Sequence, residues 1–197
     1  MVNKRIILAS ASPRRKELLM KTGLSFTILT AKEPECFQND LPIEQASMMV
    51  AYHKANEVYH TIQENERKDI LVIGADTIVV INNEILGKPI DRSDAYKMLK
   101  ELSGKTHFVM TSVAIITKEK TKTFYEKTYV TFKEMCDEEI YAYIDSENVY
   151  DKAGSYAIQG GASKYIVEEK GDYDNVVGLP LKRLLVELKQ FENEESL

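Results

Sequence analysis

The stretch Leu71-Val72-Ile73-Gly74-Ala75-Asp76-Thr77 decides the fold class, because it joins an apolar run to a carboxylate. Residues 70–73 are continuously apolar, which is typical of a strand buried on both faces in an α/β sheet. Gly74 then allows a neighbouring backbone to approach closely. Open α/β sheets form their ligand crevices just beyond the ends of strands. The stretch therefore predicts a buried strand with Asp76 just past its end, in a candidate site.

The segments on either side alternate between strand and helix patterns. The expected strands are residues 5–9, 26–29, 70–73, 78–81, 84–86, 108–117 and 123–132. The expected helices are residues 13–21, 43–60, 93–102, 138–144 and 181–191. Asn82-Asn83 separates two of the apolar runs and indicates a hairpin turn. This order predicts a mixed α/β (α+β) fold.

Composition restricts the class of protein. The 197 residues are 44% hydrophobic and 29% charged, so we expect one domain over residues 1–197, with an acidic tail from roughly residue 192. A net charge of -5 provides no general basic surface, which argues against long nucleic acid as a partner. Neither a signal peptide nor a membrane span is indicated. Cys36 and Cys136 lie far apart, which fits a reducing compartment, so we expect a cytoplasmic protein.

The segment Leu8-Ala9-Ser10-Ala11-Ser12-Pro13-Arg14-Arg15 predicts the start of a helix, with Ser12 as N-cap and a proline at the first helical position. Arg14 and Arg15 oppose the helix dipole there, and a bound anion would reverse that cost. Backbone N–H groups, the hydroxyls of Ser10 and Ser12, and two guanidinium groups would form a triphosphate site. A solvated helix start explains the same pattern, and the segment alone leaves both interpretations open.

Asp76 is suited to bind a metal ion or to orient and deprotonate water, and Thr77 to contact a base or a phosphate. Glu33 and Glu35 follow the second expected strand and would complete a site for Mg²⁺ or Mn²⁺, which prefer oxygen ligands. Turn or cap aspartates and solvated loop glutamates are the alternatives. The residues alone do not decide between these interpretations.

Two further segments offer polar groups for binding. Lys88 stands between Gly87 and Pro89, which would hold an ammonium group near a phosphate, although this tripeptide is common in turns. The segment from residue 151 to residue 161 is rich in small residues and carries Gln159, whose amide is able to bind a base edge. A purely structural loop is the alternative for that segment.

Other catalytic patterns are excluded or weak. Ser103-Gly104-Lys105-Thr106 resembles the end of a P-loop, but residue 99 is leucine where the motif requires glycine, so we interpret Gly104 as a helix-ending residue. His53, His60 and His107 lack a ligand spacing and are expected on helices or at the surface. No Ser/His/Asp or Cys/His set is apparent, which disfavours covalent catalysis.

Six segments in register resemble the Maf family of nucleoside triphosphate pyrophosphatases. They are residues 8–15, 74–77, 86–89, 103–107, 151–160 and 177–181. The resemblance implies a two-lobed fold like that of inosine triphosphate pyrophosphatases, with a central mixed sheet, flanking helices and a cleft between the lobes. It also implies dependence on a divalent metal, Mg²⁺ or Mn²⁺, and often a homodimer.

The resemblance also assigns roles by position. Asp76 matches the family's proton acceptor and, with Glu35, its metal site. The substrate-binding positions are Ser10, Ser12, Arg14, Arg15, Lys54 and Lys88. The specificity positions are Arg14, Thr77 and Gln159. Arg, Thr and Gln at these positions are typical of the dTTP/UTP branch, from which the chain departs at Ala157, where glycine is usual, and at Pro34, which interrupts the glutamates.

The function implied by the resemblance is metal-dependent hydrolysis of nucleoside triphosphates, dTTP and UTP, to the monophosphate and pyrophosphate. Modified pyrimidine triphosphates are an alternative substrate class. A different kind of function is a nucleotide-binding regulator of septum formation that acts through a cell-division partner.

Overall fold

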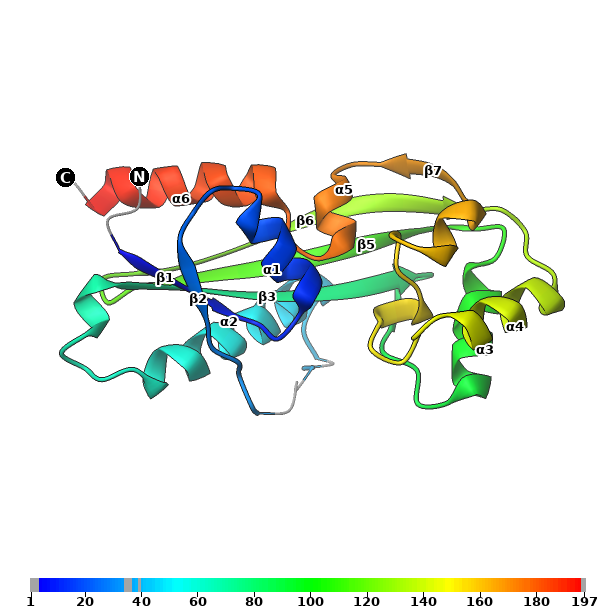
Figure 1. The fold of residues 1–197 in the computed structure, drawn as a ribbon, viewed down its shortest axis with the longest axis horizontal. Helices are drawn as coiled ribbons and strands as arrows, with labels where there is room; N and C mark the ends of the chain where they lie inside the picture. Colours follow the sequence, from blue (N-terminus) through cyan, green and yellow to red (C-terminus); the bar gives the residue numbers. More distant parts are fainter. Residues whose placement is uncertain (1–3, 34–36, 39, 196–197) are drawn as a thin grey trace. The chain divides into compact units, whose positions relative to one another are not determined.

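The computed structural model describes residues 4–33, 37, 38 and 40–195, and residues 192–195 by their backbone alone. The strands are β1 (Arg5–Ala9), β2 (Phe26–Ile28), β3 (Ile70–Ile81), β4 (Glu84–Leu86), β5 (Thr106–Ile116), β6 (Thr121–Phe132) and β7 (Ile166–Lys170). The helices are α1 (Pro13–Met20), α2 (Ile43–Thr61), α3 (Arg92–Leu102), α4 (Asp137–Ser146), α5 (Tyr173–Val177) and α6 (Leu181–Glu195) (Figure 1). Short 3₁₀ turns cover Arg67–Asp69, Ala153–Ser155 and Gly161–Tyr165.

The strands of the described residues form one mixed sheet in the order β2-β1-β3-β5-β6-β7, and β4 pairs with β3. Strand β1 runs parallel to both β2 and β3, as a β-α-β opening requires. The β3–β4 and β6–β7 pairs are antiparallel. The predicted mixed α/β class is therefore confirmed.

Strand β3 corrects the prediction for the segment that decides the fold. We expected separate strands over residues 70–73 and 78–81, with Asp76 just past the first, but one twelve-residue strand runs from Ile70 to Ile81. Asp76 therefore lies within the strand. Glycine, alanine and aspartate are poor strand formers, but pairing within a buried sheet overrides this weak propensity.

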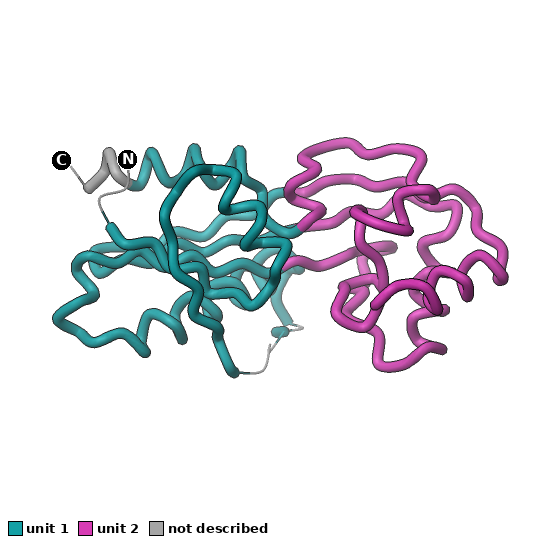
Figure 2. The backbone as a smooth tube through the Cα atoms, viewed as in Figure 1, with its two compact units in different colours: residues 1–76, 111–126, 178–197 teal, residues 77–110, 127–177 magenta. Residues whose placement is uncertain are grey.

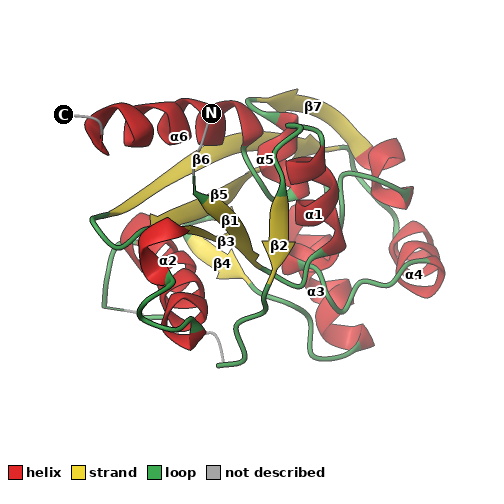
Figure 3. Ribbon diagram, turned by 60° about the vertical axis from the view of Figure 1, so that its left-hand side comes forward, coloured by secondary structure: helices red, strands yellow, loops and turns green. Residues whose placement is uncertain are grey.

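The chain forms two compact units (Figure 2). Unit 1 comprises Met1–Asp76, Thr111–Glu126 and Gly178–Leu197. Within it, α2 and α6 cover opposite faces of the strands (Figures 1 and 3). The core beneath α2 joins apolar side chains of that helix to others from β1, β3 and β5. This core includes Ile7, Ala51, Ala55, Val58, Tyr59, Ile70, Val72, Ala114 and Ile116.

Unit 2 comprises Thr77–Met110 and Lys127–Val177. Its core is built from β3, β5 and β6 with α3 and α4, and includes Val79, Leu99, Leu102, Val109, Val130, Phe132, Ile140, Tyr143 and Tyr156. The predicted hairpin is confirmed, since Val79 pairs with Leu86 and both Asn82 and Asn83 adopt positive φ, as a tight hairpin turn requires. Gly104 follows α3 with φ of 71°, which confirms it as a helix-ending residue.

The other expected helices and strands are present within a few residues of the predicted bounds, whereas β7, α5 and the 3₁₀ turns were missed. None of the helices in the described part of the chain combines the length and the apolar character that crossing a membrane requires.

Candidate functional site

The centre of the candidate site in unit 1 is a buried ion pair. Lys54, on α2, donates from Nζ to Oδ1 of Asp76, on β3, at 2.7 Å. The two side chains are only 16% and 6% exposed, respectively. A buried carboxylate is costly unless it is paired, and the ammonium group compensates its charge. The fold thus brings two of the predicted site residues together in a sheltered place.

Gly74 explains how α2 comes close enough to β3 for this pair to form. A Cβ atom at this glycine would lie 2.5 Å from the carbonyl oxygen of Ala51 and 2.8 Å from the Cβ of Ala55, both on α2. Only glycine leaves room for this approach, as the sequence predicted. The helix that carries Lys54 therefore touches the strand two residues before Asp76.

The predicted helix start after β1 is also present. Ser12 is the N-cap of α1, its hydroxyl accepts the N–H of Arg15, and Pro13 occupies the first helical position. Ser10 is buried, and its Oγ accepts the N–H of Ser12 at 3.2 Å. Arg14 is half-buried in the same turn. Both serines therefore shape the loop between β1 and α1.

Arg15 contacts the protein's own backbone. Its Nε donates to the carbonyl oxygen of Gly178 at 2.8 Å, and its Nη1 donates to the carbonyl oxygen of Ala75 at 2.9 Å. The same Nη1 lies 3.3 Å from Oγ of Ser10. The guanidinium group therefore joins the β1–α1 loop, strand β3 and the segment before α6, a set of contacts that the sequence did not predict.

Unit 2 holds three more of the predicted residues, with Thr77 half-buried on β3 and Lys88 and Gln159 exposed on loops. The two loops are joined, because the N–H of Gly154 donates to the carbonyl oxygen of Gly87 at 2.9 Å. Gly154 adopts φ of 65°, and a Cβ there would lie 3.0 Å from the side chain of Val79. The loop that carries Gln159 is thus fixed beside the one that carries Lys88.

Neutral side chains hold the Gln159 loop from within. The ring nitrogen Nε2 of His107 lies 2.7 Å from the hydroxyl of Tyr156, and both rings pack edge-on against Phe132. Burial lowers the pKa of His107 to about 4. The expectation that His107 is a helix or surface residue is therefore wrong: it lies on β5, only 2% exposed, because the aromatic core encloses it. His53 and His60 are exposed on α2, as expected.

Helix α4 supports the same loop from its other end. The carboxylate of Glu147 accepts the N–H of Gly161 at 2.9 Å, and the hydroxyl of Tyr143 accepts the N–H of Ala157 at 3.4 Å. The segment between these anchors carries Gln159. Sequence reasoning missed three residues that support this loop, Tyr143, Glu147 and Tyr156. Each makes its hydrogen bond to a residue at least 14 positions away in the sequence.

Of the two residues predicted to hold a metal ion, the structure describes Asp76. The predicted partner Glu35 lies outside the described residues. Residues 4–33, 37, 38 and 40–195 contain no group of three His, Cys, Asp or Glu side chains able to hold an ion. Asp76 nevertheless fits Mg²⁺ or Mn²⁺, because such ions are commonly held by one or two carboxylates together with substrate phosphates.

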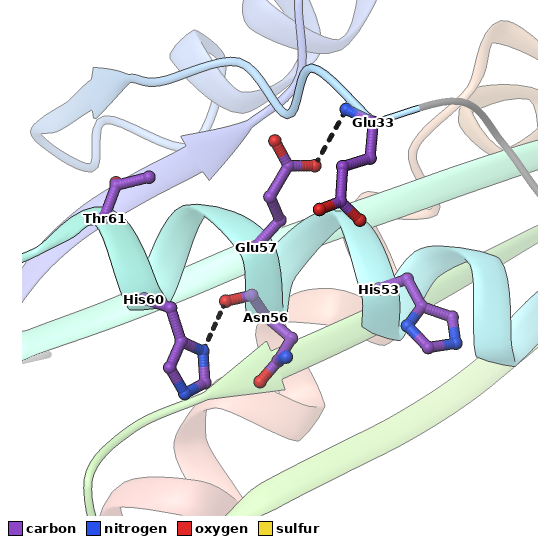
Figure 4. Close-up of a pocket in the computed structure, with 6 residues that line it drawn as sticks. All are labelled: Glu33, His53, Asn56, Glu57, His60 and Thr61. Atoms are coloured by element: carbon purple, nitrogen blue, oxygen red, sulfur yellow. Dashed lines mark hydrogen bonds between the residues drawn. The ribbon is translucent and has the colours of Figure 1, made fainter.

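Glu33, the other glutamate predicted to complete the metal site, lines a hollow of about 360 Å³ along α2. His53, Asn56, Glu57, His60 and Thr61 line it as well (Figure 4). The carboxylate of Glu57 accepts the N–H groups of Lys32 and Glu33 at 2.6 and 3.2 Å. It thereby ties the segment after β2 to α2. The residues that line this hollow include Glu33 but neither Asp76 nor Lys54.

Fold and site together define a mixed α/β protein with a buried carboxylate–lysine pair at the centre of a polar site. A profile of the family described as Maf-like protein matches residues 5–191. The chain therefore belongs to the Maf-like protein family, which confirms the resemblance found in the sequence.

Individual relatives support this assignment. The dTTP/UTP pyrophosphatase of Bacillus cereus (strain ATCC 10987 / NRS 248) is 52% identical over 188 residues, which cover 95% of this chain and 90% of the relative. The protein of the same name from Bacillus anthracis (strain CDC 684 / NRRL 3495) is 50% identical, with 95% and 96% covered.

Solved structures give a more distant likeness. The Ham1 protein of Staphylococcus aureus matches with a TM-score of 0.46 and 12% identity, over 66% of this chain and 72% of the other. A nucleoside-triphosphatase / dITP/XTP pyrophosphatase of Mycobacterium abscessus ATCC 19977 / DSM 44196 matches with a TM-score of 0.40 and 10% identity, over 66% and 75%.

Proposed function

We propose that this protein hydrolyses nucleoside triphosphates, dTTP and UTP or their modified pyrimidine analogues, to the nucleoside monophosphate and pyrophosphate. Relatives that are 50–52% identical over nearly the whole chain carry the name dTTP/UTP pyrophosphatase. The observation that carries the proposal is the ion pair between Lys54 on α2 and the buried Asp76 on β3, in the unit that also holds the start of α1.

In the proposed reaction Asp76 accepts a proton from water, and the resulting hydroxide attacks the α-phosphorus. The bond from this phosphorus to the bridging oxygen breaks, and pyrophosphate leaves with the electron pair. Lys54 contacts Oδ1 of the carboxylate, so the proton is taken up at Oδ2. Lys54 also holds the carboxylate in one orientation, so that it is already oriented for proton transfer when the substrate binds.

The proposal includes a divalent cation, Mg²⁺ or Mn²⁺, which Asp76 would hold together with Glu35 and the phosphates of the substrate. Such an ion, when bound, neutralises phosphate charge and favours ionisation of water. Chelation is therefore expected to abolish turnover, and restoring either ion to recover it.

The remaining predicted residues bind and select the substrate in this proposal. Arg14 and Lys88 are cations that neutralise phosphate charge, and Ser10 and Ser12 present hydroxyl groups at the start of α1. Thr77 and Gln159, with Arg14, select the base. The amide of Gln159 both donates and accepts hydrogen bonds, as reading the polar edge of a pyrimidine requires.

The proposal places the enzyme in the cytoplasm and, as is common in the family, in a homodimer. The alternative of a regulator of septum formation is not supported by the comparisons, since the relatives carry the name of an enzyme. Modified pyrimidine triphosphates remain candidate substrates in this proposal. They carry the same phosphates as dTTP and UTP, so only contacts to the base distinguish them.

A substrate panel tests the proposal. Pyrophosphate and monophosphate release would be measured from dTTP, UTP, CTP, GTP and methylated GTP, each with Mg²⁺, with Mn²⁺ and with chelator. We expect metal-dependent cleavage of dTTP and UTP above the other nucleotides. Binding of dTTP without product under either metal would contradict hydrolysis and favour the regulator.

A further inference from the structure

We infer that Arg15 is a positioning residue for Asp76 rather than a phosphate ligand. The inference rests on the proposed function, since it concerns the carboxylate that takes the proton. It also gives Arg15 a role different from that of its neighbour Arg14, although the two arginines are adjacent in the same helical turn.

The first reason is where the guanidinium donors are directed. Nε and Nη1 donate to the carbonyl oxygens of Gly178 and Ala75 at 2.8 and 2.9 Å, distances typical of strong hydrogen bonds. A guanidinium group binds a phosphate in bidentate fashion through Nε with Nη2 or through Nη1 with Nη2, and each of these edges includes one of the two nitrogen atoms already bonded to a carbonyl. Bidentate binding of phosphate would therefore compete with at least one bond to a backbone carbonyl.

The second reason is that the buried carbonyl oxygen of Ala75 needs a hydrogen-bond donor. The parallel pairing of β1 with β3 ends at the Ala9–Gly74 pair, because β1 gives way to the loop that leads to α1. Ala75 is fully buried one residue further along β3. Nη1 of Arg15 donates a hydrogen bond to the carbonyl oxygen of Ala75, at the point where the pairing of β1 with β3 ends. The arginine thus extends the support of β3 up to the residue that precedes Asp76.

The third reason is the geometry of the group. A planar guanidinium holds its donors at fixed angles, so contacts to Gly178, Ala75 and Ser10 restrain three segments relative to one another. A lysine ammonium has all its donors on one nitrogen and is unable to span the same carbonyls. Arg15→Lys therefore keeps the charge and removes the restraint.

The experiment compares Arg15→Lys with the wild type on dTTP. If Arg15 positions Asp76, kcat falls roughly 100-fold, because small displacements of a catalytic group have effects of this size. KM for dTTP and inhibition by inorganic pyrophosphate should then stay within about threefold of the wild type. A large rise in KM and weaker pyrophosphate inhibition, with kcat retained, would overturn the inference. Unchanged kcat and KM would overturn it as well.

Arg67→Lys is the matched control. Arg67 is half-buried in the same unit and also donates to two carbonyls, those of Ile62 and His60, at 3.0 and 3.2 Å. We expect this variant to lose thermal stability to a similar degree with kcat unchanged. If Arg67→Lys lowers kcat as strongly as Arg15→Lys, the effect is a general loss of stability and the inference fails.

A measurement on the native protein needs neither a stable variant nor turnover. The Nε–H signal of Arg15 would be followed by NMR during addition of inorganic pyrophosphate. It should exchange slowly with solvent and keep its chemical shift, because its bond to Gly178 persists. A shift of this signal that follows pyrophosphate binding would overturn the inference. If the wild type cleaves no nucleotide, the proposed function fails, but the NMR measurement still decides whether Arg15 binds phosphate.

Discussion

The two units stabilise their functional residues by different physical means. Unit 1 fixes Asp76 with charge, through the ammonium of Lys54 at 2.7 Å and the guanidinium of Arg15 on the preceding carbonyl. Unit 2 fixes the loop of Gln159 through the neutral pair of His107 and Tyr156 and through hydrogen bonds to backbone groups of the loop, one of them accepted by the carboxylate of Glu147. A buried carboxylate needs a compensating charge, whereas a residue that reads a base needs a loop held rigidly in place.

This comparison predicts that damage in unit 1 lowers turnover on every nucleotide, and that damage in the loop of unit 2 changes the preference among bases. Variants in unit 1 test the effect on turnover and variants in unit 2 test the effect on base preference, in decreasing order of the expected change.

Lys54→Met should have the largest effect of these changes. It leaves Asp76 buried without its cation, which costs about 3 kcal/mol or more in comparable pairs, and it should lower kcat for all nucleotides by roughly 100-fold. Steady-state kinetics and urea unfolding measure both quantities. Lys4→Met is the control, since Lys4 is also 16% exposed and pairs with Glu119 at 3.0 Å away from the site. Equal kinetic losses in both variants would refute a special role for Lys54.

Gly74→Ala should destabilise the protein by about 3 kcal/mol, because the added methyl group meets a backbone carbonyl at 2.5 Å that has no room to move. It should also reduce turnover by forcing α2, and with it Lys54, away from β3. Unfolding by urea measures the change. Gly87→Ala is the control, since a Cβ at Gly87 meets nothing within 4 Å and should leave stability unchanged. A stable Gly74→Ala protein would show that the close contact is not needed.

Acidification should destabilise the core of unit 2. Because burial lowers the pKa of His107 from 6.5 to about 4, the unfolded chain binds a proton more readily than the folded chain between these values. The stability that neutral His107 contributes is thus fully present above pH 6.5 and is lost as the pH falls toward 4. The loss is at most about 3 kcal/mol.

Urea unfolding between pH 7 and pH 5 measures this effect, since the carboxylates with lowered pKa values titrate below that range. His107→Phe should be less stable at neutral pH but should show a flatter dependence on pH. An unchanged slope in His107→Phe would assign the pH dependence to other groups.

Tyr156→Phe should have the smallest effect on stability, about 1 kcal/mol, because one hydrogen bond to His107 is lost while the ring stays. The looser loop should reduce the preference for dTTP over CTP, by up to roughly tenfold in kcat/KM. Tyr129→Phe, on an exposed residue of β6, is the control. A change in kcat that is equal for all bases would contradict the division between the units.

The sequence was most informative where one residue decides a local conformation. Ser12 and Pro13 marked the start of α1, Asn82-Asn83 marked a hairpin, and Gly74 marked a close approach of backbones. Each of these depends on the geometry of a few neighbouring residues, so local rules suffice.

Features that depend on distant partners were missed. The continuity of β3 through Asp76 comes from its place in the sheet, and the propensity of Gly-Ala-Asp argues against it. The contacts of Arg15 join residues 60 and 163 positions apart, which no local pattern reports. The burial of His107 follows from the ring of Tyr156, 49 positions further along the chain. The predicted roles of Asp76, Lys54, Lys88 and Gln159 stay predictions until variants are assayed.

The most direct test of the account is pyrophosphate release from dTTP by Asp76→Asn, with Mg²⁺ and with Mn²⁺, beside the wild type and Asp69→Asn. Asparagine keeps the shape of the side chain but neither accepts the proton nor carries the charge, so turnover should fall at least about 1,000-fold while the fold is retained. Asp69→Asn, on an exposed turn before β3, should keep full activity. Wild-type turnover in a folded Asp76→Asn protein would contradict the central role of this carboxylate.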